Sequence, residues 1–233
     1  MSTVAENVAG IRERIAKAAR RAGRRPEDVR LVAVSKKVEA ERVRQAIAAG
    51  VAILGENYIQ EAQGKVEEVG RAVSWHFIGH LQTNKAKHAV RLFAMVHAVD
   101  SLALAQELSR QAGREGKVLS ILLQADLAGE ATKFGARAEE LEQMAEAISR
   151  LPSLAVKGLM TMPPYAEDPE DSRRYFAELR QLRDRLTARR IQGIVMDELS
   201  MGMSNDFEVA IEEGATLVRV GTAIFGMRPE KRK

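Results

Sequence analysis

Short apolar segments alternate with longer segments of helical period along the whole chain, and this alternation limits the fold more than any other feature. The apolar segments are nearly continuous runs, as expected of parallel strands that are covered on both faces. Between them, apolar residues recur at helical spacing, and the longest such stripe runs from Tyr175 to Leu186. The eight predicted strands are Leu31–Ser35, Val51–Gly55, Trp75–Ile78, Met95–Val99, Leu119–Ala125, Val156–Met160, Val195–Ser200 and Leu217–Val220.

Eight repeated strand–helix units are compatible with a doubly wound sheet or a closed barrel, because crossovers between parallel strands are right-handed. The chain has 233 residues, of which 45% are hydrophobic, and single (β/α)8 barrels commonly have about 200–250 residues. We therefore predict an α/β fold, a single (β/α)8 TIM barrel. A leading helix, apolar at Val4, Val8, Ile11 and Ile15, is expected to cap one face. No linker rich in Gly, Pro or Ser divides the sequence, so residues 1–233 are expected to form one domain.

Composition and charge exclude several classes of protein. The chain has no cysteine, which excludes disulfides, a thiol nucleophile and thiolate metal ligands, and fits a reducing cytoplasm. We see no signal peptide at the N-terminus and no apolar run near the roughly 20 residues that span a bilayer. The net charge of +4 is spread along helices such as 173–190, where acidic residues are interspersed. We therefore expect a cytoplasmic protein with neither membrane nor nucleic acid as a partner.

Lys36 and Lys37 follow the first predicted strand directly. Active-site residues of such barrels lie at the C-terminal ends of strands. Partial desolvation there lowers the pKa of a lysine amine, as a Schiff-base lysine requires. A lysine at a strand end can equally extend into solvent. Because successive side chains of a strand point to opposite faces, only one of the two lysines can face the barrel mouth.

The last two predicted strands are followed by loops suited to an anion. Ser200 to Asp206 follow one strand, and Arg219, Gly221 and Thr222 end the other. Glycine and hydroxyl residues after a strand let backbone N–H groups approach a phosphate closely. Phosphate sites of this fold often use the loops after the last two strands, although either glycine alone also suits a plain turn.

His76 and His80 have the i, i+4 spacing of a metal pair on a helix. Here they flank the end of a predicted strand, and neither cysteine nor carboxylate stands at ligand spacing. We therefore predict no metal site and assign these histidines structural or hydrogen-bonding roles. His88 and His97 give no stronger signal.

Six segments together resemble a known family, and they are Ala33–Lys36, Gly55–Tyr58, His76–Gln82, Gly158–Met162, Leu199–Ser204 and Arg219–Gly226. The resemblance runs in order from Leu31 to Gly226, nearly the whole chain, and identifies a pyridoxal phosphate homeostasis protein. The family's fold is similar to the barrel domain of alanine racemase and of eukaryotic ornithine decarboxylase.

The resemblance implies a cofactor, pyridoxal 5′-phosphate (PLP), and roles for particular residues. It selects Lys36 over Lys37 as the Schiff-base lysine. Ser200 or Ser204, with the backbone at Gly221 and Thr222, is implied to hold the phosphate. Two further residues are candidates for cofactor contacts, Arg219 against the pyridine nitrogen and Asn57 at the end of the second strand. A guanidinium there disfavours protonation of the nitrogen. Residue by residue, Asn57 also suits a turn, and Arg219 could instead pair with Glu198.

Three classes of function remain open. The first, which we favour, is a non-catalytic PLP-binding protein that buffers or delivers the cofactor to PLP-dependent apo-enzymes, affecting amino-acid and keto-acid metabolism. The second is a PLP-dependent racemase of weak or narrow activity, which needs a second base on the opposite face of the substrate. The third is a basic binding module unrelated to the cofactor. We expect a monomer, because the second domain that builds the racemase dimer is not evident in the sequence.

Overall fold

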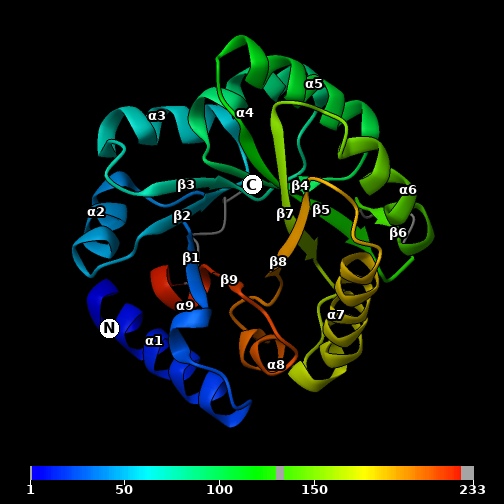
Figure 1. Cartoon of the computed structure of the whole chain (residues 1–233). Helices are drawn as coiled ribbons and strands as arrows, with labels where there is room; N and C mark the ends of the chain where they lie inside the picture. Colours follow the sequence, from blue (N-terminus) through cyan, green and yellow to red (C-terminus); the bar gives the residue numbers. More distant parts are fainter. Residues whose placement is uncertain (1, 130–133, 227–233) are drawn as a thin grey trace.

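The computed structural model describes residues 2–129 and 134–226, and strands and helices alternate along them (Figure 1). The strands are β1 (Arg30–Val34), β2 (Ile53–Glu56), β3 (Ser74–Phe77), β4 (Met95–Val99), β5 (Leu119–Asp126), β6 (Ala136–Arg137), β7 (Leu154–Thr161), β8 (Ile194–Ser200) and β9 (Leu217–Val220). The helices are α1 (Val4–Arg21), α2 (Ala40–Ala48), α3 (Ile59–Val69), α4 (Ala86–Leu92), α5 (Leu102–Arg114), α6 (Ala138–Ile148), α7 (Arg173–Ala188), α8 (Phe207–Glu212) and α9 (Thr222–Phe225).

Eight parallel strands close into a barrel, as predicted. The order is β4-β3-β2-β1-β9-β8-β7-β5, and β4 pairs with β5 to complete the ring. The first and last strands are neighbours, since Val32 of β1 is in register with Arg219 of β9. All eight predicted strands are present, with ends that differ by a few residues. The two-residue strand β6 was not predicted, and it pairs with Ala125 and Asp126 at the end of β5.

The leading helix α1 is present but does not cap a face of the barrel. It packs in the outer ring between α2 and α8 (Figure 1). The reason is the length of α9, which follows the last strand and has only four residues. The apolar face of α1 therefore covers the part of the ring that a full eighth helix would occupy, burying side chains that include Val8, Ile11 and Ala18.

Two layers of apolar side chains hold the barrel together. The larger lies between the strands and the helices. The smaller fills the barrel interior with residues from six strands, which are Val32, Ile53, Met95, Ala98, Leu122, Met160 and Leu217. Filling of the interior by side chains is usual in barrels of eight strands. The functional site must therefore lie above this layer, at an end of the barrel.

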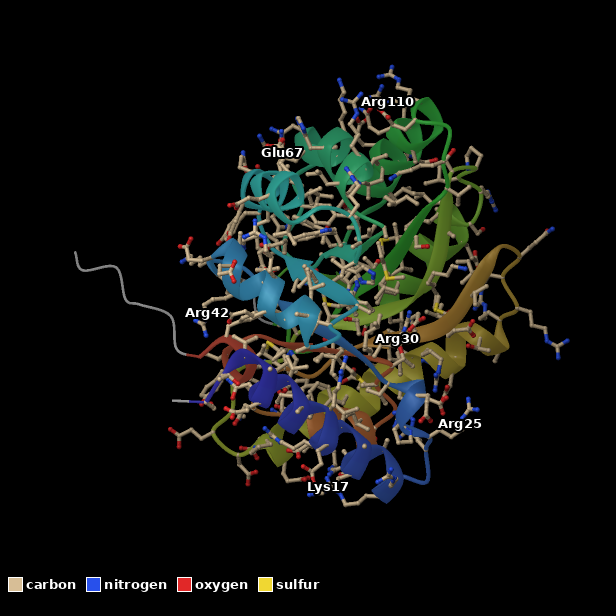
Figure 2. All side chains as sticks on the ribbon, turned by 90° about the vertical axis from the view of Figure 1, so that its left-hand side faces the viewer. Lys17, Arg25, Arg30, Arg42, Glu67 and Arg110 are labelled. Carbon is tan, nitrogen blue, oxygen red and sulfur yellow. The ribbon has the colours of Figure 1, made fainter. Side chains whose placement is uncertain are left out.

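Charged side chains are distributed over the outside of the ring. Figure 2 shows Lys17, Arg42, Glu67 and Arg110 pointing outward from four different helices. Many of the cations are paired, for example Lys17 with Glu13 at 2.8 Å. In the described residues the charge is thus mixed, as the sequence predicts.

Candidate functional site

A cavity of about 270 Å³ opens at the C-terminal ends of the strands. Its walls come from the segments that follow β1, β2, β3, β7, β8 and β9. Six of the seven residues predicted to contact the cofactor line it, and the seventh, Ser200, lies behind the wall. The full lining is Val34, Lys36, Asn57, Ile78, Met162, Tyr165, Ala166, Met203, Ser204, Asn205, Asp206, Arg219, Gly221 and Thr222.

Lys36 reaches the cavity because β1 ends just before it. Its side chain is half-buried, whereas that of Lys37 is exposed. The chain turns sharply at Lys37, whose φ of 59° lies in the left-handed region that few residues with a Cβ adopt. Of the two candidate lysines, it is therefore Lys36 that faces the cavity.

The loops after β8 and β9 meet at Ser204. Its Oγ accepts hydrogen bonds from the backbone N–H groups of Gly221, at 3.3 Å, and Ala223, at 3.4 Å. Gly202 allows this meeting, because its φ is 87° and a Cβ there would lie 2.6 Å from the Cβ of Ala210. Its carbonyl also accepts a hydrogen bond from the N–H of Arg219. The two loops thus meet at one hydroxyl, and Ser204, Gly221 and Thr222 line the same part of the cavity.

Arg219 lies in β9 and contributes its guanidinium to the wall, although only 5% of the residue is exposed. One guanidinium nitrogen donates to Ser200 Oγ at 2.6 Å, and another donates to the carbonyl of Thr161 at 2.9 Å. Burial lowers the pKa of Arg219 to about 10, and Asp206 opposes this effect. The group remains a cation at neutral pH.

The alternative pairing of Arg219 with Glu198 does not occur. The carboxylate of Glu198 instead accepts hydrogen bonds from Arg30 and from the hydroxyl of Thr216. Both Arg30 and Thr216 lie at the N-terminal ends of β1 and β9, so Glu198 belongs to the opposite end of the barrel.

A buried chain of hydrogen bonds runs from Arg219 across the barrel interior. His97 Nδ1 lies 2.9 Å from Ser200 Oγ, and its Nε2 lies 2.9 Å from His76 Nδ1. His76 Nε2 lies 3.1 Å from Ser74 Oγ. Since β3 and β4 lie opposite β8 and β9 in the ring, the chain spans the barrel from side to side.

One assignment of donors and acceptors along this chain starts at Arg219. Arg219 can only donate, so Ser200 accepts from it and its own proton is available for His97 Nδ1. His97 then donates from Nε2 to His76, and His76 donates to Ser74. In this assignment each of the two imidazole N–H groups has an acceptor within the chain. Burial lowers the pKa of His76 to about 4 and that of His97 well below its usual range, so both rings are neutral.

The histidine roles were predicted in part. His76 forms hydrogen bonds, as expected, while His80 lies away from it with Nδ1 at 3.4 Å from a carboxylate oxygen of Asp100. The role of His97 was missed, because a single histidine in a buried strand carries no pattern. Among the described residues, no group of three or more His, Asp or Glu side chains is placed to hold a metal ion.

Asn57 directly follows β2 and lines the cavity, so its predicted contact with a cofactor is sterically open. Its Oδ1 is buried and has no hydrogen-bond partner within residues 2–129 and 134–226. Gly79 packs directly against the backbone of Asn57, since a Cβ on that glycine would lie 2.6 Å from the backbone oxygen of Asn57. A buried amide oxygen without a donor is costly, so this position is suited to a ligand that supplies one.

None of the helices in the described part of the chain is long and apolar enough to cross a membrane.

Comparison with known proteins agrees with this geometry. The family model of the alanine racemase N-terminal domain matches residues 7–229. The pyridoxal phosphate homeostasis protein of Aquifex aeolicus is 44% identical over 96% of this chain and 97% of its own length. That of Pseudomonas aeruginosa is 46% identical over 98% and 97%. The structure of PipY from Synechococcus elongatus PCC7942, solved with PLP bound, is 37% identical and superposes with a TM-score of 0.86 over 96% of this chain and 100% of that one. The chain therefore belongs to the family of pyridoxal phosphate homeostasis proteins, which is built on the N-terminal domain fold of alanine racemase.

Proposed function

We propose that the chain binds PLP covalently through Lys36, holds it in the cavity at the barrel mouth and takes part in the intracellular homeostasis of this cofactor. The observation that carries the proposal is the convergence on one cavity of Lys36, Arg219 and the loops around Ser204. PipY, a relative at 37% identity, is described as having PLP bound, which supports the same ligand here.

The residues present fit the chemical groups of PLP. The phosphate needs N–H and O–H donors, which Ser204 and the backbone at Gly221 and Thr222 offer. The aldehyde needs an amine, which Lys36 provides. The unpaired Oδ1 of Asn57 suits a donor on the ligand. Of the two serines that the sequence left open, we assign the phosphate contact to Ser204, because the hydroxyl of Ser200 is engaged with Arg219 and His97.

Lys36 would act as the nucleophile of the attachment. Its amine, once deprotonated, would form a C=N bond with the aldehyde carbon, and the aldehyde oxygen would leave as water with the two amine protons. When bound, PLP supplies an electron-withdrawing pyridine ring. Arg219 would place its positive charge near the ring nitrogen and so disfavour protonation of that nitrogen, which would keep the ring a weak electron acceptor. This role of Arg219 suits a holder of the cofactor better than an enzyme that draws electrons into the ring.

We infer the cellular role from the family to which the chain belongs. We infer that the protein buffers PLP and delivers it to apo-enzymes in the cytoplasm, acting as a monomer and without turning over a substrate of its own. The absence of cysteine from the sequence is consistent with a reducing compartment.

Reductive trapping tests the proposal. Incubation with PLP followed by borohydride should add one pyridoxyl phosphate group, and mass spectrometry of peptides should locate it on Lys36. The Lys36→Ala variant should carry no such adduct, whereas the control Lys37→Ala, which alters the adjacent exposed lysine, should be labelled like the wild type. Labelling of Lys36→Ala at an undiminished level, or loss of labelling in Lys37→Ala alone, would contradict the assignment.

A further inference from the structure

A buried ion cluster lies behind the end of β1, on the side of α3. Lys65 in α3 is 7% exposed, and Glu56 at the end of β2 is fully buried. The Nζ of Lys65 lies 2.8 Å from Glu56 Oε1 and 2.7 Å from Glu61 Oε1. Buried lysines and glutamates are rare and need partners.

The cluster holds both residues that flank Lys36. On one side, Lys65 donates to the carbonyl oxygen of Ser35, and the hydroxyl of Ser35 donates to Glu56 Oε1 at 2.6 Å. On the other side, the backbone N–H of Lys37 donates to Glu61 Oε1. The turn from Ser35 to Lys37 is therefore fixed at three points, although Lys37 has an unfavourable positive φ.

Stability alone is a weak explanation for this arrangement. A buried ion pair often contributes little net stability, because the loss of hydration offsets the attraction between the charges. The Oε2 of Glu56 has no hydrogen-bond partner in the described structure, so the cluster also leaves a polar atom unpaired. Burial accordingly raises the pKa of the Glu56 carboxyl, and the hydrogen bonds and charge of Lys65 oppose this effect. What the cluster achieves is a fixed backbone on both sides of one side chain.

We propose that Glu56 and Lys65 are positioning residues that hold the Ser35–Lys37 turn, so that the amine of Lys36 enters the cavity in the orientation needed to attack the aldehyde of PLP. This inference rests on the proposed function. Neither Glu56 nor Lys65 lines the cavity, and both act through their contacts with Ser35. Their loss should therefore impair formation of the C=N bond without impairing recognition of the ring and phosphate.

Two ligands separate these effects. PLP can react with Lys36, whereas pyridoxine 5′-phosphate has the same ring and phosphate but a hydroxymethyl group in place of the aldehyde. Stopped-flow absorbance gives the rate of C=N bond formation with PLP, and calorimetry gives the Kd for pyridoxine 5′-phosphate. In Lys65→Met and Glu56→Gln we expect the rate to fall about tenfold or more, since small misplacements of a reacting group cost up to roughly 100-fold. The Kd should change less than about twofold, and Lys65→Arg, which retains the charge, should recover part of the rate.

The matched control is Lys17→Met, which breaks the exposed pair with Glu13 on α1 and should alter neither quantity. If Lys65→Met does not fold, Ser35→Ala removes only the hydroxyl contact with Glu56 and should give a smaller loss of rate in a folded protein. An unchanged rate, or an equal loss of rate and of pyridoxine 5′-phosphate affinity, would overturn the positioning role. Failure of the proposed function is distinct, because Lys36→Ala would then retain the adduct.

Discussion

The hydroxyl of Ser200 lies 2.6 Å from a guanidinium nitrogen of Arg219 and supports that side chain from behind the cavity wall. The two serines at the end of β8 consequently have different roles, although they are only four positions apart. Ser204 presents its hydroxyl where the last two loops meet, and Ser200 joins Arg219 to the histidines inside the barrel.

Replacement of each serine should separate these roles. We expect Ser204→Ala to weaken the binding of pyridoxine 5′-phosphate by about fivefold, the usual effect of losing about 1 kcal/mol of hydrogen bonding. Ser200→Ala should leave unchanged the contribution of the ligand's phosphate group to binding affinity. Calorimetry with pyridoxine and with pyridoxine 5′-phosphate measures this contribution as a ratio of affinities. An equal fall of that ratio in Ser200→Ala would show that our assignment of the phosphate contact is wrong.

Arg219→Glu should change the protonation of the cofactor. Replacing the cation by an anion favours a proton on the pyridine nitrogen near neutral pH and makes the ring a stronger electron acceptor. We expect weaker retention of PLP and slow transamination of added amino acids. Nitrogen-15 NMR of labelled PLP bound to both proteins reports the protonation directly. A ring-nitrogen signal that does not move between wild type and variant would exclude contact between Arg219 and the ring.

The buried histidines should make stability depend on pH. Because the pKa of His76 is about 4 in the folded protein, against 6.5 for a histidine in water, the unfolded chain binds more protons between these values. The contribution of the buried neutral histidines to the free energy of unfolding is fully present above about pH 6.5 and is lost as the pH falls towards 4. For His76 this loss is about 3 kcal/mol. His97 acts in the same direction.

Chemical denaturation between pH 4.5 and 7.5 checks this dependence. His76→Asn keeps an acceptor for His97. It should reduce the slope of unfolding free energy against pH by an amount that corresponds to up to one bound proton. The control His80→Asn alters a partly exposed histidine near Asp100 and should leave most of the slope. A wild-type protein equally stable at both ends of this range would contradict the prediction.

Two glycine substitutions should have opposite effects on stability. Gly158 in β7 has a φ of 154°, and a Cβ there would overlap the carbonyl oxygen of Glu198 in β8. We expect Gly158→Ala to destabilise the protein by several kcal/mol, or to prevent folding, because backbone must move. Gly64 lies in α3 with open space around it, so Gly64→Ala should stabilise by about 0.5–1 kcal/mol. Thermal unfolding followed by circular dichroism compares the two, and a stable Gly158→Ala would refute the argument.

The fold was predictable because most strands contain an apolar run whose residues are buried, as β4 does throughout, and such a run can be recognised from neighbouring residues. The position of α1 was predicted wrongly because it depends on the shortness of α9, more than 200 residues later. The strand β6 was missed because two residues carry no periodicity.

The positions of Lys36, Asn57 and Arg219 at one cavity were predictable because all three lie at or just after strand ends and stand in segments that resemble the family. The residues that support the site from behind could not be predicted from the sequence. Neither Lys65 nor His97 belongs to a motif, and each acquires its role from partners on other elements, Ser35 and Glu56 for the lysine and Ser200 for the histidine. Such contacts exist only once the chain is folded.

The pairing of β1 with β9 also has a consequence for the order in which the molecule is made. The side chain of Asn7 bonds the carbonyl of Ile224, 217 positions away, and the cavity takes Lys36 from the start of the barrel and Thr222 from its end. A ribosome releases the N-terminal segments first. The edge of β1 that pairs with β9 therefore remains unpaired until β9 has been synthesised. Contacts of such long sequence separation slow folding. The nascent chain therefore cannot form the complete cavity before Thr222 has been synthesised, and until then the β9-facing edge of β1 has no partner strand.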